Sequence, residues 1–164
     1  MGRPLEPERL GDHVDRLYRA AWALCGSRED AEDLVQDTFA RVLARPRFLR
    51  KEDDIGYLLG ALRNTFLLRK RTESRRARTD PLPEEAADLL ADPHAAEPEA
   101  ALAARELYGA IAALADDYRD VLVAVDVAGL SYKEAARELR IPEGTVMSRL
   151  YRARQHVVRQ IDAR

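Results

Sequence analysis

The stretch from residue 131 to residue 154 carries side chains whose types and spacing could bind DNA. Ser131 stands three residues before Glu134, which is the spacing of a capping box at the start of a helix over 132–139. Pro142 bars that helix from continuing, because its ring removes a backbone donor and clashes with the preceding turn. A second helix is therefore expected to begin near residue 143.

This second helix would present a polar face to the outside. Val146 and Leu150 lie one helical turn apart and are expected to point inward, which leaves outside Thr145, Ser148, Arg149, Tyr151 and Arg152. Arginine can contact a guanine edge with two hydrogen bonds, and serine and threonine can reach bases or phosphates. Arg154 and Arg159 would extend the positive charge along the DNA backbone. The pattern predicts a DNA-binding helix-turn-helix, although an ordinary helical hairpin with a solvated basic face would share it.

A second basic cluster occupies the end of an earlier helical stripe. Its members are opposed only by Glu73, and they are Arg63, Arg69, Lys70, Arg71, Arg75, Arg76 and Arg78. Such a run is compatible with nucleic-acid contact. It is equally compatible with a solvated helix end.

A third cluster is acidic and lies between residues 30 and 39. Asp30, Asp33, Gln36 and Asp37 fall on the helical face opposite Ala31, Leu34, Val35 and Phe39. Grouped carboxylates can hold a metal or serve as acid and base, but no histidine is near enough in sequence to join them. A solvated face and a protein-docking face are the two interpretations that remain.

The rest of the composition argues against several classes of protein. The chain has one cysteine, Cys25, and three scattered histidines, so neither a disulfide framework nor a thiolate metal cluster is expected. Cys25 is expected to be a buried structural thiol, no cofactor is expected, and no nucleophile with a paired base suggests an enzyme. Without a signal peptide or a long apolar run, the protein is expected to be soluble and cytoplasmic, with no membrane insertion.

Charge and periodicity divide the 164 residues into three parts. Residues 1–79 carry 17 basic and 13 acidic residues, and three apolar stripes in them repeat with helical period. Residues 80–100 carry seven acidic residues, no basic ones and four prolines, which favours a flexible linker. Residues 101–164 carry 10 basic and nine acidic residues and return to the helical period. The sequence thus predicts an all-α protein of two small helical domains joined by a flexible acidic linker.

Three segments in this order resemble an extracytoplasmic-function (ECF) sigma factor of the sigma-70 superfamily. The segment 27–39 (SREDAEDLVQDTF) is similar to the part of region 2 that docks on RNA polymerase, and 57–64 (YLLGALRN) resembles the helix beside the minus-10 reading loop. The segment 130–154 (LSYKEAARELRIPEGTVMSRLYRAR) resembles the region 4 helix-turn-helix for the minus-35 element. The resemblance covers nearly the whole chain and assigns 1–79 to region 2 and 101–164 to region 4.

The resemblance also implies a function and its partners. It implies a factor that binds core RNA polymerase through the clamp coiled coil and the flap and directs promoter-specific initiation. An anti-sigma factor would hold it inactive until a stress or other signal arrives. Its DNA partners would be duplex at the minus-35 element and a melted strand at the minus-10 element.

The residues implied for each contact are carried over by position. Those for the polymerase clamp are Asp30, Asp33, Gln36 and Asp37. Those for the minus-10 strand are Phe48, Arg50, Lys51, Asp54, Arg63, Asn64, Lys70 and Arg71, and those for the minus-35 duplex are Thr145, Ser148, Arg149, Tyr151 and Arg152. The chain departs from the family at Met147, where Lys or Arg is usual, at Leu68, where Asp is frequent, and at Tyr57, where Trp is frequent.

Two rival functions follow from the same residues. A two-domain regulator would bind duplex DNA by itself as a dimer, with 1–79 as its effector or dimer domain. A pure interaction protein would use its basic faces on acidic partners and show no preference for DNA. Transcription by core polymerase with and without the chain separates all three.

Overall fold

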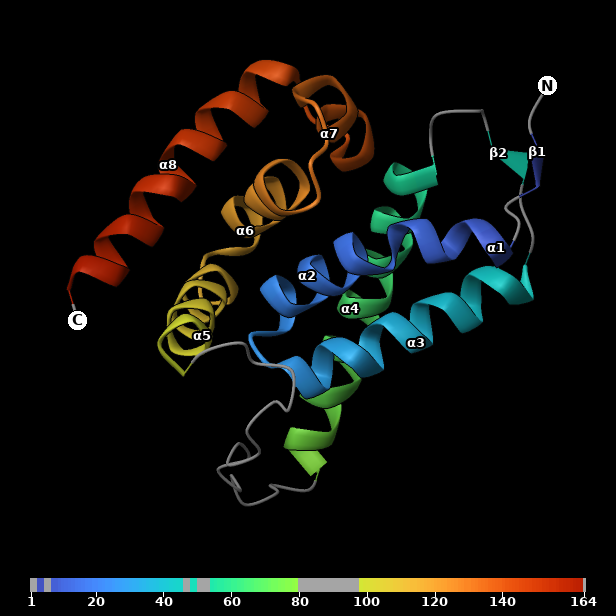
Figure 1. Cartoon of the computed structure of the whole chain (residues 1–164), viewed down its shortest axis with the longest axis horizontal. Coiled ribbons are helices and arrows are strands. Elements are labelled where there is room, and N and C mark those ends of the chain that lie inside the picture. The colour runs from blue at the N-terminus through green and yellow to red at the C-terminus, as the bar shows by residue number, and fades with distance from the viewer. Residues whose placement is uncertain (1–2, 5–6, 46–47, 50–53, 80–97, 164) are drawn as a thin grey trace.

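A computed structural model describes residues 3–4, 7–45, 48–49, 54–79 and 98–163, and within these ranges the chain is almost wholly helical (Figure 1). The N-terminal half contains β1 (Arg3–Pro4), α1 (Pro7–Leu10), η1 (Gly11–His13), α2 (Val14–Cys25), α3 (Arg28–Ala44), β2 (Phe48–Leu49) and α4 (Asp54–Thr79). The C-terminal half contains α5 (Pro98–Ala112), α6 (Asp116–Leu122), the π-helix η2 (Val123–Val127), α7 (Tyr132–Leu139) and α8 (Glu143–Asp162). The predicted all-α class is confirmed, and the antiparallel pair of β1 with β2 is two residues long on each side.

The N-terminal half is a bundle in which α2, α3 and α4 bury one face each. Leu17, Leu34, Leu58 and Leu62 are fully enclosed at the centre, as their helical spacing predicts. The turn between α2 and α3 is built from Gly26, whose φ of +77° is accessible to glycine without strain. Ser27 then caps α3, because its hydroxyl accepts a hydrogen bond from the Asp30 amide at 3.4 Å.

The C-terminal half packs α6, α7 and α8 around a smaller core. Val121, Val146, Leu150 and Ala153 are buried there, so the predicted inward orientation of Val146 and Leu150 is confirmed. The apolar stripe of α5 is only partly used, because Leu102 and Leu107 stay exposed while Ile111 is buried.

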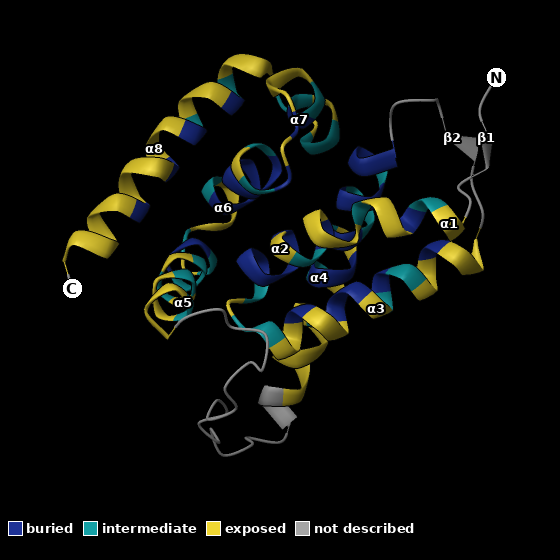
Figure 2. Cartoon of the chain, viewed as in Figure 1, coloured by how far each residue is buried: buried dark blue, intermediate teal, exposed yellow. Residues whose placement is uncertain are grey.

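The two halves lie against each other. Helix α5 and η2 contact α2, and α7 contacts α4, so that α6 and α7 face the bundle while α8 lies on the side away from it (Figures 1 and 2). Helix α5 already begins at Pro98, inside the predicted linker of 80–100, whose residues 80–97 lie outside the described ranges. The arrangement of the halves was not predicted.

Two further properties hold for the described ranges. Every helix in them is too short or too polar to cross a membrane. They contain no group of three or more His, Cys, Asp or Glu side chains placed to bind a metal ion.

Candidate nucleic-acid interface

The helix-turn-helix predicted from the sequence is present as α7, a tight turn and α8. The Ser131 hydroxyl accepts a hydrogen bond from the Glu134 amide at 3.1 Å, which satisfies one of the free amides in the first turn of α7. Helix α7 ends at Leu139 and is capped by Arg140, which adopts a left-handed conformation with φ +57°. This conformation reverses the chain, and α8 begins directly after Pro142.

One face of α8 is buried and the other is open. Val146, Leu150, Ala153 and Val157 bind the helix to its own half at three- and four-residue steps. The open face bears the five predicted minus-35 residues: Ser148, Tyr151 and Arg152 are exposed, and Thr145 and Arg149 are half-buried at its edge. Met147 is 54% exposed on the same face.

Some hydroxyl and guanidinium groups of this face already make contacts within the protein. Ser148 donates a hydrogen bond to the Thr145 carbonyl at 3.2 Å and keeps its lone pairs for an incoming donor. Arg149 lies 3.9 Å from the exposed Asp117 on α6, a loose pair that a phosphate can displace.

Arg154 has a structural role that the sequence did not indicate. Its Nε and Nη2 donate to the two carboxylate oxygens of Asp126 at 2.8 and 2.7 Å. Hydrogen bonding to Asp126 raises the pKa of Arg154. This two-pronged bond ties α8 to η2, so Arg154 is engaged within the protein rather than held out toward a DNA backbone.

The predicted minus-10 residues that are described lie along α4. Lys70 and Arg71 are exposed, and Asn64 is exposed beside the half-buried Arg63. Lys70 also rests 5.0 Å from the Phe66 ring, a cation–π contact that keeps its ammonium near the helix surface. These four side chains supply donors for phosphates and bases on one helix.

The other minus-10 predictions have different outcomes. Asp54 is only 5% exposed and forms an ion pair with Arg9 at 3.4 Å. It therefore anchors the start of α4, and its carboxylate is hardly accessible to a DNA strand. Phe48 is described only as part of β2. Arg50 and Lys51 lie outside the described ranges.

The predicted polymerase face is a continuous polar surface on α3. Asp30, Asp33 and Gln36 are exposed and Asp37 is half-buried, while Ala31, Leu34, Val35 and Thr38 are buried on the opposite side. Asp37 pairs with Arg41 one turn further on, at 3.4 Å. The other charges of this face stay available to a basic partner.

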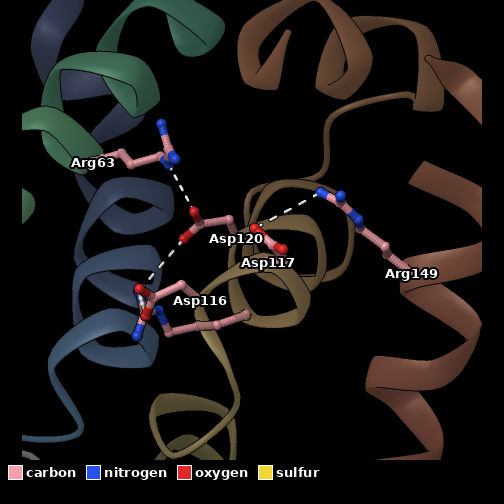
Figure 3. A network of polar contacts seen from close by, with 6 residues as sticks. Arg63, Asp116, Asp117, Asp120 and Arg149 are labelled. Atoms are coloured by element: carbon pink, nitrogen blue, oxygen red, sulfur yellow. Dashed lines mark hydrogen bonds and ion pairs between the residues drawn. The ribbon is translucent and has the colours of Figure 1, made fainter. Parts of the chain in front are cut away.

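A polar network missed by the sequence analysis joins the two halves (Figure 3). Arg63 Nε of α4 donates to Asp120 Oδ2 of α6 at 2.8 Å, and Asp120 is only 8% exposed. Beside it, the Arg119 guanidinium is 2% exposed, lies 2.9 Å from Asp116 and 3.7 Å from Asp120, and stands 5.0 Å from the Phe66 ring of α4. One signal was present in the sequence: Arg119 precedes the buried Leu122 by three residues and so shares its apolar face.

The same boundary contains a partly open cavity of about 660 Å³. Arg63 and Asn64 line it from α4, while Asp120, Glu138 and Arg140 line it from the second half. Tyr57 and Leu68, two of the departures from the family, also line it. The predicted minus-10 surface therefore opens into a space between the halves.

The fold and these surfaces define a class of two-domain transcription proteins. Two family models match in the order found in the structure: "Sigma-70 region 2" covers residues 10–76 and "Sigma-70, region 4" covers residues 104–157. Together they account for both helical halves.

Curated relatives narrow this class. The chain is 35% identical over 157 residues to "ECF RNA polymerase sigma factor SigE" of Mycolicibacterium smegmatis, covering 94% of this chain and 60% of that one. It is 33% identical to "ECF RNA polymerase sigma factor EcfG" of Rhodopseudomonas palustris over 86% of this chain and 76% of that one. It is 32% identical to the "RNA polymerase sigma-E factor" of Streptomyces coelicolor over 100% of this chain and 93% of that one. The chain belongs to the ECF family of RNA polymerase sigma factors.

Solved structures share the fold. The sigma factor RpoE from Bartonella quintana, solved with the anti-sigma factor NepR, superposes with a TM-score of 0.76 at 24% identity over 94% of this chain and 95% of that one. CnrH, solved with the cytosolic domain of CnrY, superposes with a TM-score of 0.63 at 22% identity over 95% of this chain and 86% of that one.

Proposed function

We propose that this chain is a sigma factor that binds core RNA polymerase and directs initiation at specific promoters. The observation that carries the proposal is the presence of both sigma-70 regions, each with an open polar face where the family resemblance assigns a contact. The chain itself supplies recognition and strand capture, and RNA synthesis belongs to the polymerase. It would therefore act in the cytoplasm and needs no cofactor.

The open face of α8 is proposed to read the minus-35 duplex. The buried face of α8 packs against its own half, and Arg154 bonds α8 to Asp126 of η2. The helix can therefore enter a major groove as a rigid body. Arg149 and Arg152 supply guanidinium forks for guanine edges or phosphates, Thr145 and Ser148 supply hydroxyls, and Tyr151 supplies a 64% exposed ring for apolar contact.

The surface of α4 is proposed to hold the melted minus-10 strand. Arg63, Asn64, Lys70 and Arg71 can bind phosphates and base edges, and the segment after Phe48, with Arg50 and Lys51, is proposed to capture a flipped base. Unstacking a base costs on the order of a few kcal/mol, which contacts in the bound state must offset. Asp54 is left out of this set because it is buried and paired with Arg9.

Two surfaces are proposed to meet the polymerase. The acidic face of α3 (Asp30, Asp33, Gln36 and Asp37) would bind the clamp coiled coil. The exposed apolar side chains of α5 and α8, which are Leu102, Leu107, Val158 and Ile161, would bind the flap, since exposed apolar patches mark protein-docking sites. Leu107 and Val158 also line a second cavity of about 370 Å³.

The linker sets how the two DNA contacts combine. With 1–79 as region 2, 80–100 as tether and 101–164 as region 4, docking of one half holds the other at high effective concentration near its own element. Each contact alone would be weak and salt-sensitive. Specific promoter binding should therefore require the polymerase.

An inhibitory protein partner is also proposed. RpoE and CnrH, which share this fold, were solved bound to NepR and to the cytosolic domain of CnrY. This supports regulation of the present chain by an anti-sigma factor that is released in response to a signal.

The decisive experiment is transcription from a library of genomic fragments by purified core polymerase, with and without the chain, followed by sequencing of RNA 5′ ends. Start sites that share upstream elements and need the chain are expected. Asp33→Lys should abolish these starts, because it places a cation on the face proposed for the clamp, and Glu32→Lys, exposed on the same helix, is the matched control. Specific duplex binding without polymerase, together with no new start sites, would instead favour the independent regulator.

A further inference from the structure

We propose that the cavity between α3, α4 and α7 is a binding site for a nucleotide, whose phosphates bind arginine side chains from both halves of the chain and whose base packs on Tyr57. This site goes beyond the contacts with polymerase and DNA proposed above. It does not depend on them, because it rests on the residues that line the cavity.

The lining of the cavity is strongly cationic. It includes two carboxylates and five arginines, which are Arg41, Arg45, Arg63, Arg137 and Arg140. The excess of three positive charges suits a ligand with several negative charges. Phosphate groups meet this requirement, since a terminal phosphate carries about 1.5 to 2 negative charges at neutral pH. The planar fork of a guanidinium also binds two phosphate oxygens at once.

Several of these guanidinium groups remain available to a ligand. Arg63 binds Asp120 through Nε at 2.8 Å, so the terminal nitrogens of its fork can bind a second anion. The guanidinium groups of Arg45 and Arg140 make no ion pair within the described ranges. The cavity therefore contains positive charge that these parts of the protein do not balance.

Arg140 has a backbone conformation that an arginine rarely adopts. Its φ of +57° makes it the one residue other than glycine with a positive φ in the described part of the chain. A Cβ atom disfavours this left-handed region, and glycine is the usual residue at such a helix end. A strained residue of this kind points to a function for its side chain. Here the turn after α7 places an arginine of the second half in the lining of the cavity.

The second carboxylate of the lining, Glu138, packs against the backbone of α4 where two glycines leave room for it. A Cβ built on Gly60 would lie 3.2 Å from Glu138 Oε2, and one built on Gly56 would lie 2.9 Å from Glu138 Oε1. A side chain at either position would displace Glu138. The two glycines therefore keep this negative charge at the α4 wall of the cavity.

The rest of the lining suits a planar ring. Tyr57 is half-buried, and Leu24, Leu59 and Val123 are buried apolar residues of the same lining. An aromatic side chain stacks on a base whatever the identity of that base. The volume of about 660 Å³ lies within the range of roughly 300–1,000 Å³ that is typical of small-molecule sites. An apolar wall beside an arginine cluster fits a ligand with a base at one end and phosphates at the other.

The binding test is calorimetric titration of the purified full chain with ADP, pyrophosphate and adenosine. ADP should bind most tightly, because it carries both the ring and the phosphates. Pyrophosphate lacks the ring and should bind more weakly, and adenosine lacks the charge and should bind most weakly. Pyrophosphate that binds as tightly as ADP would overturn the assignment to a nucleotide. Absence of ADP binding would overturn the site itself.

Arg140→Gly is expected to change binding and stability in opposite directions. Loss of a charge-assisted contact should weaken ADP binding about tenfold or more. The melting temperature should rise, because glycine adopts a positive φ without strain. A folded variant that binds ADP as tightly as the parent would overturn the role of Arg140.

Arg45→Gln tests the same cluster without a change in backbone strain. Arg45 is exposed, so the variant should keep the parent's melting temperature and also bind ADP about tenfold more weakly. Arg159→Gln is the matched control, since Arg159 is exposed on α8 and is not part of the lining. Equal losses in Arg45→Gln and Arg159→Gln would indicate general charge attraction and overturn the site.

A DNA strand presents the same phosphates and is the alternative occupant. Arg63 and Asn64 line the cavity and also belong to the proposed minus-10 surface, so ADP should compete with a short mixed-sequence strand. If the strand loses affinity in Arg45→Gln and Arg140→Gly while ADP does not bind, the cavity extends the minus-10 surface and the nucleotide site is overturned. If ADP binds as expected but the chain directs no promoter-dependent transcription, the nucleotide site stands and the proposed function fails.

Discussion

Met147 presents an apolar thioether on the exposed face of α8, among side chains proposed to contact DNA. Replacing it by arginine should add one phosphate contact to the interface. Each contact releases condensed counterions, so the slope of log affinity against log salt should steepen by about 0.9. Fluorescence titration of duplex DNA with the purified chain at several salt concentrations measures this slope. Gln160→Arg adds the same charge at an exposed site near the end of α8, and an equal change in that variant would contradict a specific role for position 147.

Cys25 gives a prediction that depends on pH. Cys25 is half-buried and not fully buried as predicted. This partial burial, reinforced by Asp30, raises the pKa of the thiol to about 12, so the native protein holds a proton that the unfolded chain releases above about pH 9. The free energy of unfolding should then fall as pH rises from about 9 toward about 12. The thiol should also react far more slowly with a disulfide reagent at about pH 8 in the native state than in urea. Cys25→Ala should lack this part of the pH dependence, and equal native and unfolded reaction rates would contradict the burial.

At the scale of the element, the start of α7 depends on one hydroxyl. Ser131→Ala removes the acceptor of the Glu134 amide, and loss of such a cap should lower the free energy of unfolding by about 1 kcal/mol. Ser131→Asp keeps an acceptor at the same place and should lose much less. Urea denaturation followed by circular dichroism gives both values. A loss as large in Ser131→Asp as in Ser131→Ala would point to another cause.

The helices themselves were largely predictable, because each carries its own periodic pattern. The spacing of Val146 and Leu150 correctly predicted which face of α8 is buried, and Ser27 and Ser131 correctly marked where α3 and α7 begin. Val14 and Leu43 share the apolar stripes of α2 and α3 but remain 37% and 44% exposed. A stripe predicts the direction of a face and does not say how far neighbouring helices extend over it.

The roles of individual charges were less predictable. Arg154 and Asp126 are 28 residues apart, and Arg63 and Asp120 are 57 apart, so no helical spacing connects the members of either pair. The sequence assigned Arg154 to DNA because a basic residue on a recognition helix is ordinarily free. Only tertiary structure shows that Asp126 holds it.

At the scale of the whole molecule, the sequence predicted two halves on a tether but not their packing. Few of the residues that join the halves stand out along the chain: Gly56 and Gly60 resemble weak positions in a helix, and Arg119 is marked only by its place on an apolar helical face. A tether makes even a weak interface effective, because it keeps the halves at high local concentration. The two halves can therefore stay packed together without a large interface.

The stack between Trp22 and Tyr108 has an optical consequence. Trp22 is the only tryptophan of the chain, it is 5% exposed, and its partner ring belongs to the other half. Its emission should be blue while the two halves are packed together and should shift to the red in Tyr108→Ala, which uncovers the indole. Tyr18→Phe is the control, since Tyr18 lies 6.5 Å from Trp22 on the same helix and its replacement should leave the spectrum unchanged. If the shift in Tyr108→Ala is absent, the stack does not persist in solution. If it is present, the fluorescence of Trp22 measures the contact between the two halves in the unlabelled protein.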